Sequence, residues 1–256
     1  MVFPTQGNRK KLGGDVSMLI DVKNMDHREL NDRIRDAQED CAITNCCGQR
    51  FIAVGMSDKH ITIEGVPGNA LGAYLGGASV TVLSNAQDAV GDTMNDGEIV
   101  IHGNVGDAAG YAMRGGSIYV KGNAGYRAGI HMKAYREKKP VMVIGGRAGS
   151  FLGEYQAGGL ILVLGLRCDG RKIVSYFPCT GMHGGKMILR SDCKDVVFPT
   201  QVSCHPATAE DLAEIREYVE NFCRKFSMDT ETIMDAPFTV ITPNSSNPYR
   251  QMYVAN

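Results

Sequence analysis

The sequence predicts an all-β solenoid, namely a right-handed parallel β-helix of about six to seven turns with flanking N- and C-terminal helices. Two observations predict this fold class. Glycine fills 31 of the 256 positions, well above the usual share of about 7 %. A short strand pattern of alternating apolar and variable residues also recurs, with copies that begin at Ile61, Val80, Ile99, Ile118, Val141 and Ile161. A period of about 20 residues is typical of a stacked coil.

Each copy is interpreted as one turn of the coil, because no copy holds a helix long enough for a crossover between strands. Equivalent strands should stack in parallel about 4.8 Å apart, and connections between parallel strands are right-handed as a rule. Gly106 and Gly125 are expected at one corner of neighbouring turns, where positive φ or close stacking excludes a side chain. The expected inward columns are Ile61/Ile63, Val80/Val82, Ile99/Ile101, Ile118/Val120, Val141/Val143 and Ile161/Val163.

We expect one domain overall, in three parts. Residues 1–50 form an N-terminal segment with a helix at about 26–40. Residues 51–190 form the glycine-repeat β-helix. Residues 191–256 hold a C-terminal helix at about 208–225 and an extended tail.

The two helices are predicted from their start signals. Asp26 and Glu29 resemble a capping box, and Met25 and Leu30 have the spacing of a hydrophobic staple. Thr208 begins the second helix. Its apolar stripe consists of Leu212, Ile215, Val219, Phe222 and Phe226. The tail is expected to be extended because it contains Pro237, Pro243 and Pro248.

The outer face of the later turns needs a cover. The side chains expected to point away from the core there are Met142, Ile144, Leu162 and Leu164. Leaving such side chains in water forfeits about 1.5–3 kcal/mol each. We therefore expect the helix at about 208–225 to pack across the strands at 141–144 and 161–164.

Several stretches of the chain resemble the glycine-repeat (GXGXG) domain at the C-terminus of the glutamate synthase large subunit. They are Gly48–Phe51, Asn95–Gly116, Gly125–Lys133, Gly149–Gly159 and Gly181–Gly185. The similarity runs colinearly from about Ile20 and includes positions other than glycine, such as Met113 and Arg114.

This resemblance implies a non-catalytic structural subunit or domain of a glutamate synthase-type oxidoreductase, which makes glutamate from glutamine and 2-oxoglutarate. FMN, an iron–sulfur cluster and an amidotransferase nucleophile would then belong to flavin-domain and amidotransferase partner subunits. Two alternatives stay open. The chain could be a scaffold subunit of another redox enzyme, such as formylmethanofuran dehydrogenase, where a related domain occurs, or an independent solenoid interaction protein.

Composition excludes other classes of protein. Lys plus Arg number 27 and Asp plus Glu 28, so the formal net charge of −1 argues against a nucleic-acid partner. The longest apolar run, Leu160–Leu164, is far shorter than the about 20 residues that cross a bilayer. No apolar segment follows the charges near the N-terminus, so neither a signal peptide nor a membrane partner is expected and the location should be cytoplasmic.

We assign no catalytic, cofactor-binding or metal-binding residues to this chain. The cysteines are Cys41, Cys46, Cys47, Cys168, Cys179, Cys193, Cys204 and Cys223, with no C-x-x-C pair and no cysteine at the start of the chain. The histidines are His27, His60, His102, His131, His183 and His205, and none forms a metal-binding pair at helical spacing. His102 is expected on the outer face of its strand, as a surface or interface residue.

Two loops need a separate interpretation. Residues 145–153 superficially resemble a dinucleotide loop, but the segment leads to another strand, whereas a phosphate site needs a helix N-terminus. Residues 131–140 carry Lys133, Arg136, Lys138 and Lys139. This basic segment fits either a solvated loop or a docking loop for a partner subunit.

A first prediction follows for the purified chain. We expect no flavin or iron–sulfur chromophore and no glutamate synthase activity, because neither a cluster motif nor a helix-opening phosphate loop is present. Visible absorption spectroscopy tests this expectation. A stoichiometric visible band that persists after purification would contradict it.

Overall fold

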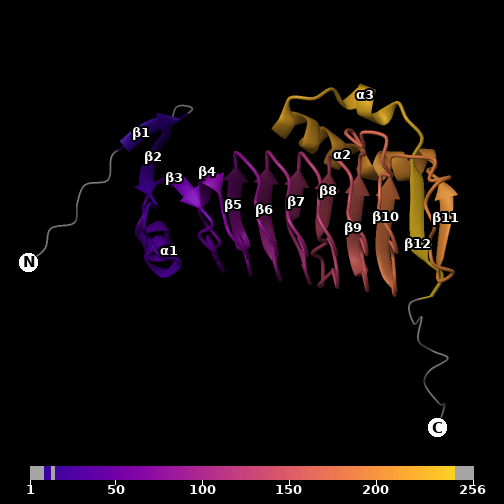
Figure 1. Cartoon of the computed structure of the whole chain (residues 1–256), viewed down its shortest axis with the longest axis horizontal. Helices are drawn as coiled ribbons and strands as arrows, with labels where there is room; N and C mark the ends of the chain where they lie inside the picture. The colour runs from indigo at the N-terminus through magenta and orange to yellow at the C-terminus, as the bar shows by residue number, and fades with distance from the viewer. Residues whose placement is uncertain (1–8, 13–14, 246–256) are drawn as a thin grey trace, which may run out of the picture.

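The computed structural model describes residues 9–12 and 15–245, which form one long stack of strands (Figure 1). The N-terminal elements are β1 (Arg9–Leu12), β2 (Asp15–Asp21), α1 (His27–Asp36), β3 (Asp40–Cys47) and β4 (His60–Val66). The central strands are β5 (Gly76–Val82), β6 (Asp96–Ile101), β7 (Ser117–Val120), β8 (Val141–Ile144), β9 (Ala157–Val163) and β10 (Gly184–Leu189). The C-terminal elements are β11 (Val202–Pro206), α2 (Ala209–Phe226), α3 (Thr230–Met234) and β12 (Thr239–Pro243).

Strands β2 to β10 pair in parallel with their neighbours in chain order, which confirms a parallel β-solenoid. Within the described residues it has about eight turns, slightly more than expected. The additional turns precede residue 51, because β2 and β3 already lie in the parallel ladder. The glycine pattern did not predict these turns, because β3 contains no glycine. Right-handedness of the coil stays a prediction.

Each turn has three sides. The sheet side consists of β2 to β10. The short side is a column of single parallel bridges through Ala86, Val105, Ala124, Ala148 and Val174, all of them buried. On the third side alternate residues adopt the left-handed α conformation, as at Arg127, Gly129 and His131 with φ of 58°, 68° and 55°. We call this third side the αL side.

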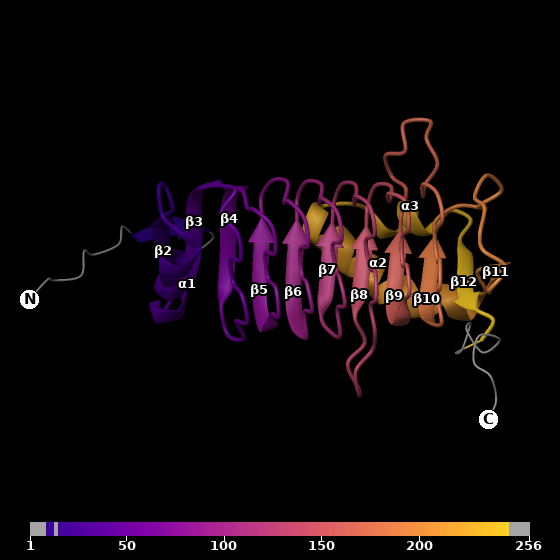
Figure 2. The ribbon, with the colours of Figure 1, turned by 60° about the horizontal axis from the view of Figure 1, so that its bottom comes forward.

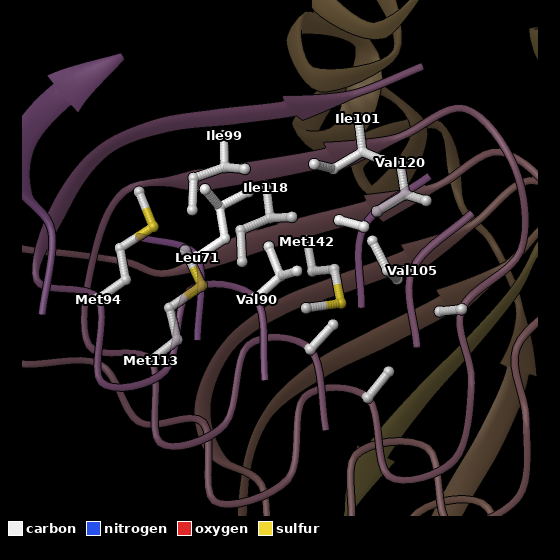
Figure 3. Close-up of a cluster of buried hydrophobic side chains, with 14 of the residues drawn as sticks. Leu71, Val90, Met94, Ile99, Ile101, Val105, Met113, Ile118, Val120 and Met142 are labelled. Atoms are coloured by element: carbon white, nitrogen blue, oxygen red, sulfur yellow. The ribbon is translucent and has the colours of Figure 1, made fainter. Parts of the chain in front are cut away.

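The solenoid core is a column of stacked aliphatic side chains, and Figure 3 shows Ile99, Ile118 and Met142 facing the same interior space. The predicted inward columns are confirmed for the turns that begin at Ile61, Val80, Ile99, Ile118 and Ile161.

The fifth inward column was predicted wrongly. Ile118 pairs with Met142, so Met142 and Ile144 point into the core whereas Val141 and Val143 face outward. A slip of one residue exchanges the two faces of a strand. This strand is apolar at all four positions, so alternation could not fix its register.

Helix α2 covers the outer face of the later strands, as predicted (Figures 1 and 2). Its side chains Ile215, Val219 and Phe222 are fully buried. The outward column that receives them, in register from β6 to β10, is Val100, Tyr119, Val143, Leu162 and Ile188. The same column holds Thr62 and Thr81 in the earlier turns. In this column the residues are apolar in the turns that the helix covers and are threonine in the two turns just before them.

Both helix starts and the end of α2 match the sequence prediction, whereas the end of α1 does not. The Asp26 side chain accepts hydrogen bonds from the backbone amides of Arg28 and Glu29 at 2.7 and 3.0 Å. The expected end of α1 at about residue 40 was wrong, because the chain turns extended at Ala37 and enters β3. Thr208 caps α2 in a capping box with Asp211. In the tail, β12 is extended, and Pro248 lies outside the described residues.

Side-chain ladders join successive turns at two corners. Asn85 Oδ1 accepts from the Asn104 amide at 2.7 Å, and Asn104 Oδ1 accepts from the Asn123 amide at 2.8 Å. At the next corner Asp88 Oδ1 accepts from the Asp107 amide at 2.9 Å. Gly106 precedes this amide, and a Cβ there would lie 2.0 Å from Asp88 Oδ1 and 3.1 Å from Asp88 N. Glycine is therefore required at this position because the chain stacks closely on the preceding turn. The backbone φ of Gly106 is not positive, so backbone conformation is not the reason.

Substitution of Gly106 is predicted to destabilise the solenoid. We expect Gly106→Val to cost about 1–3 kcal/mol, because the new side chain displaces the Asp88 carboxylate and presses on the preceding turn. Thermal unfolding gives the measurement. Gly76→Val is the matched control, since a Cβ at Gly76 would meet nothing closer than 3.8 Å and φ is not positive there. Equal melting midpoints for the two variants would refute the stacking argument.

A third prediction concerns the polar attachment of α2. Lys186 Nζ lies 3.1 Å from Asp211 Oδ1 and 2.6 Å from Glu214 Oε2. Burial alone would raise the pKa of Asp211, but hydrogen bonds from Thr208 and Lys186 outweigh burial and hold this pKa at about 2, below its ordinary 3.8. The lowered pKa stabilises the fold above about pH 4, and this contribution disappears as the pH falls toward 2.

Asp211→Asn should therefore flatten the loss of stability between pH 4 and pH 2, by on the order of 1 kcal/mol. Chemical denaturation at a series of pH values measures this. If the free energy of unfolding of the wild type and the variant changes with pH in the same way, the interaction of Asp211 with Lys186 contributes nothing to stability.

Candidate docking surface

Most of the cysteines are buried, and Cys47 and Cys204 are the exposed ones among the described residues. Five are buried, Cys168 is partly exposed, and all eight are free thiols. Burial raises the pKa of Cys41 and of Cys46 to about 11, and it also raises the pKa of Cys179. A thiol that keeps its proton at neutral pH is a poor nucleophile and a poor metal ligand. Among the described residues no three His, Cys, Asp or Glu side chains gather in a way that could hold a metal ion.

Two of the histidines, His27 and His102, pack against aromatic rings. His102 faces outward from β6, as predicted, and its ring meets Phe226 of α2 edge-on with centroids 5.1 Å apart. Burial, with a smaller effect of Lys121, lowers the pKa of His102. His27 contacts Phe51 at 5.6 Å between centroids. These rings therefore lie in aromatic contacts within the fold.

The glycine-rich segment 145–153 is a corner of the solenoid. The amides of Gly145, Gly149 and Gly153 donate to carbonyl oxygens of the preceding turn at 2.7, 3.0 and 2.8 Å. A phosphate site needs amides that point at the ligand from a helix N-terminus. Here those amides are already bonded, and the segment continues into β9.

The basic loop 131–140 is held by its own chain. Lys138 Nζ lies 2.7 Å from Asp96 Oδ2, and Lys139 Nζ lies 2.7 Å from Glu214 Oε1. In Figure 2 this loop, before β8, projects from one edge of the stack, and the loop after β9 projects from the opposite edge. Two of the four basic side chains of loop 131–140 therefore form ion pairs with carboxylates of the same chain.

Aromatic side chains line the αL side of the later turns. Tyr126, Phe151 and Phe177 follow one another from turn to turn, with ring centroids 5.2 Å apart at each step. His131 stacks on Tyr155 at 5.1 Å, with an angle of 10° between the ring planes. We call this surface the aromatic face; its residues are Tyr111, Tyr126, Arg127, His131, Phe151, Tyr155, Tyr176 and Phe177.

An ion pair holds the rings of the aromatic face in place. The Arg127 guanidinium carbon lies 4.9 Å from the Tyr126 ring centroid and 5.6 Å from that of Phe151. Arg127 Nε donates to Glu154 Oε2 at 2.8 Å, and the Glu154 residue is only 6 % exposed. Cation–π contacts and a largely buried carboxylate together fix the orientation of the surface rings.

The aromatic face continues into a groove of about 530 Å³ at the later turns. Its cations are Arg147, Arg171 and Lys172, and its apolar walls are Tyr176, Phe177, Val196 and Val197. We call it the cationic groove. None of the described residues that line it is acidic; the carboxylate of Asp169 lies 3.7 Å from the guanidinium of Arg171. Arg147 is held by hydrogen bonds to the Lys172 carbonyl at 3.0 Å and to Ser175 Oγ at 3.3 Å.

Sequence reasoning missed both surfaces. The pairs Tyr126-Arg127, Ser150-Phe151 and Tyr176-Phe177 occupy the same place in three successive turns. Their separations differ from the 19-residue step of the earlier turns, so a search at a fixed period does not align them. A register anchored on the corner glycines Gly125 and Gly149 would have aligned Tyr126 with Ser150 and Arg127 with Phe151, but the next turn has Ser175 at that corner.

The fold and these surfaces define a glycine-repeat β-solenoid with a covered sheet side and an exposed aromatic side. The chain belongs to the GXGXG motif family, whose model matches residues 15–244. The resemblance drawn from the sequence to a GXGXG domain is thus confirmed.

Two known proteins are similar to this chain. An uncharacterised protein of Methanocaldococcus jannaschii is 43 % identical over 254 residues, covering 94 % of this chain and 97 % of that protein. In fold, the chain resembles one from the crystal structure of the formyltransferase/hydrolase complex of Methylorubrum extorquens with methylofuran. The TM-score is 0.59 at 18 % identity, covering 88 % of this chain and 91 % of that chain. No helix among the described residues is both long and apolar enough to cross a membrane.

Proposed function

We propose that this chain is a non-catalytic scaffold in a glutamate synthase-type oxidoreductase, and that it packs against flavin-domain and amidotransferase components. The observation that carries the proposal is the aromatic face, a fixed and exposed surface of the kind that protein partners bury. Membership of the GXGXG family supports the same reading. FMN, the iron–sulfur cluster and the amidotransferase nucleophile would belong to the partners.

The chemistry of this chain's own groups supports a scaffold. Catalysis needs titratable groups gathered in one site with pKa values suited to proton or group transfer. Here burial raises the pKa of thiols such as Cys41 and Cys193. The amides of the glycine corners bond to the preceding turn instead of pointing into a cavity.

A second candidate is a scaffold subunit of a formylmethanofuran dehydrogenase-type enzyme. The specific observation in its favour is the likeness in fold to a chain of the formyltransferase/hydrolase complex. An independent interaction protein would use the same aromatic face. The three candidates differ in the partner, and the partner can be tested directly.

Co-expression with the candidate partners is the decisive test. We expect the chain to co-elute with the flavin-domain and amidotransferase subunits of the same organism. We also expect omission of the chain to lower glutamate formation from glutamine and 2-oxoglutarate by about tenfold or more, equivalent to about 1.4 kcal/mol. Molybdenum- or tungsten-enzyme subunits serve as the comparison set. Co-elution with that set alone would favour the second candidate, and co-elution with neither would leave the independent interaction protein.

A further inference from the structure

We propose that the aromatic face and the cationic groove together form the docking site for a partner subunit, and that they receive a segment in which carboxylates flank an aromatic or aliphatic side chain. This inference rests on the proposed function and deepens it, because it names the side of the solenoid that the partner covers and the chemistry of the segment that binds there.

The distribution of exposed apolar side chains indicates that the partner covers the αL side. The sheet side of the later turns is already closed by α2. Large side chains left exposed on the αL side are Phe51, Tyr74, Tyr111, Tyr126, Tyr176 and Phe177. Tyr176 and Phe177 are 71 % and 62 % exposed, and Val197 beside them is 82 % exposed. Aromatic side chains gathered in this way mark protein interfaces and dominate their binding energy.

The charge of the groove selects the partner's chemistry. Arg147, Arg171 and Lys172 line the groove, and none of its described lining residues is acidic. Arg171 also pairs with Asp169 outside the lining, and Lys172 Nζ donates to the Asp195 carbonyl oxygen. Guanidinium groups bind carboxylates through paired, charge-assisted hydrogen bonds. Tyr176 and Val197 form apolar walls beside these cations, and a small inorganic anion would leave such walls in water. The groove therefore fits an acidic segment that also carries an apolar anchor.

The surface is also ordered before anything binds. The Arg127 guanidinium lies against the rings of Tyr126 and Phe151, and its Nε donates to Glu154. Phe151 and Phe177 contact each other at 5.2 Å between centroids. Side chains that are already immobilised lose little further entropy on association, so more of the contact energy appears as affinity.

The test measures binding of the purified flavin-domain and amidotransferase subunits to the full chain and its variants by calorimetry. Phe177→Asp is expected to weaken binding by about tenfold or more, as for a central aromatic anchor. Phe177 has a φ of 58°, which aspartate tolerates better than most residues, so this variant should fold. Arg171→Glu combined with Lys172→Glu should also weaken binding by about tenfold and reduce its dependence on salt.

Matched controls separate this surface from the rest of the molecule. Leu83→Asp replaces an exposed apolar residue directly after β5, and Arg224→Glu reverses an exposed charge on α2. Both should bind like the wild type, and circular dichroism should show the same fold for every variant.

Three other outcomes of the binding experiment would contradict the docking site or the proposed function. If the wild type binds and the variants at Phe177, Arg171 and Lys172 bind equally well, this docking site is wrong while the proposed function stands. If the wild type binds neither subunit, both fail. If light scattering shows a dimer of this chain that Phe177→Asp dissociates, the surface pairs two copies and the acidic partner segment is refuted.

Discussion

Close contact between successive turns is the constraint on which the rest of this structure depends. Parallel strands repeat every 4.7–4.9 Å or so, and the corners must keep the same spacing although they are not strands. Glycine meets this requirement where a Cβ would strike the turn before it, as at Gly106 and Gly149. The ladders of Asn85 and Asp88 then use the freed space to bond the amides of the next turn. The stacking distance thus accounts for glycine at corners such as these.

Alternation and glycine spacing were enough to predict the solenoid, most of its core and the helix that covers it. The predictions failed where the sequence pattern does not distinguish the two faces of a strand or does not mark the start of a turn. The strand at Val141 is apolar on both faces, so the register predicted for it was wrong by one residue. Strand β3 has no glycine, so the first turns were assigned to the N-terminal segment. The aromatic face was missed because residues such as Arg127 and Phe151 adopt positive φ, a conformation that sequence rarely announces for side chains of this size.

The sheet side and the αL side of the coil have different roles. The sheet side of the later turns is closed within the chain, since Phe222 approaches Gly145 closely and Lys225 lies 4.9 Å from the Tyr119 ring centroid while bonding to Glu98. The αL side carries its rings outward, held by contacts between neighbouring turns. A surface built on a stacked backbone is as rigid as the stack itself, which suits a protein whose proposed role is to hold other subunits in place.

The antiparallel strands at the two ends have a further consequence for the length of the assembly. A parallel coil exposes at each end a row of backbone donors and acceptors that could template another coil, and unlimited growth of this kind yields fibres. Here β1 runs antiparallel to β2 at one end, and β12 runs antiparallel to β10 at the other with β11 beyond it. Each reversal replaces the hydrogen-bond pattern of the coil with one that another parallel turn does not match. The parallel ladder of the coil therefore ends within the chain at both ends.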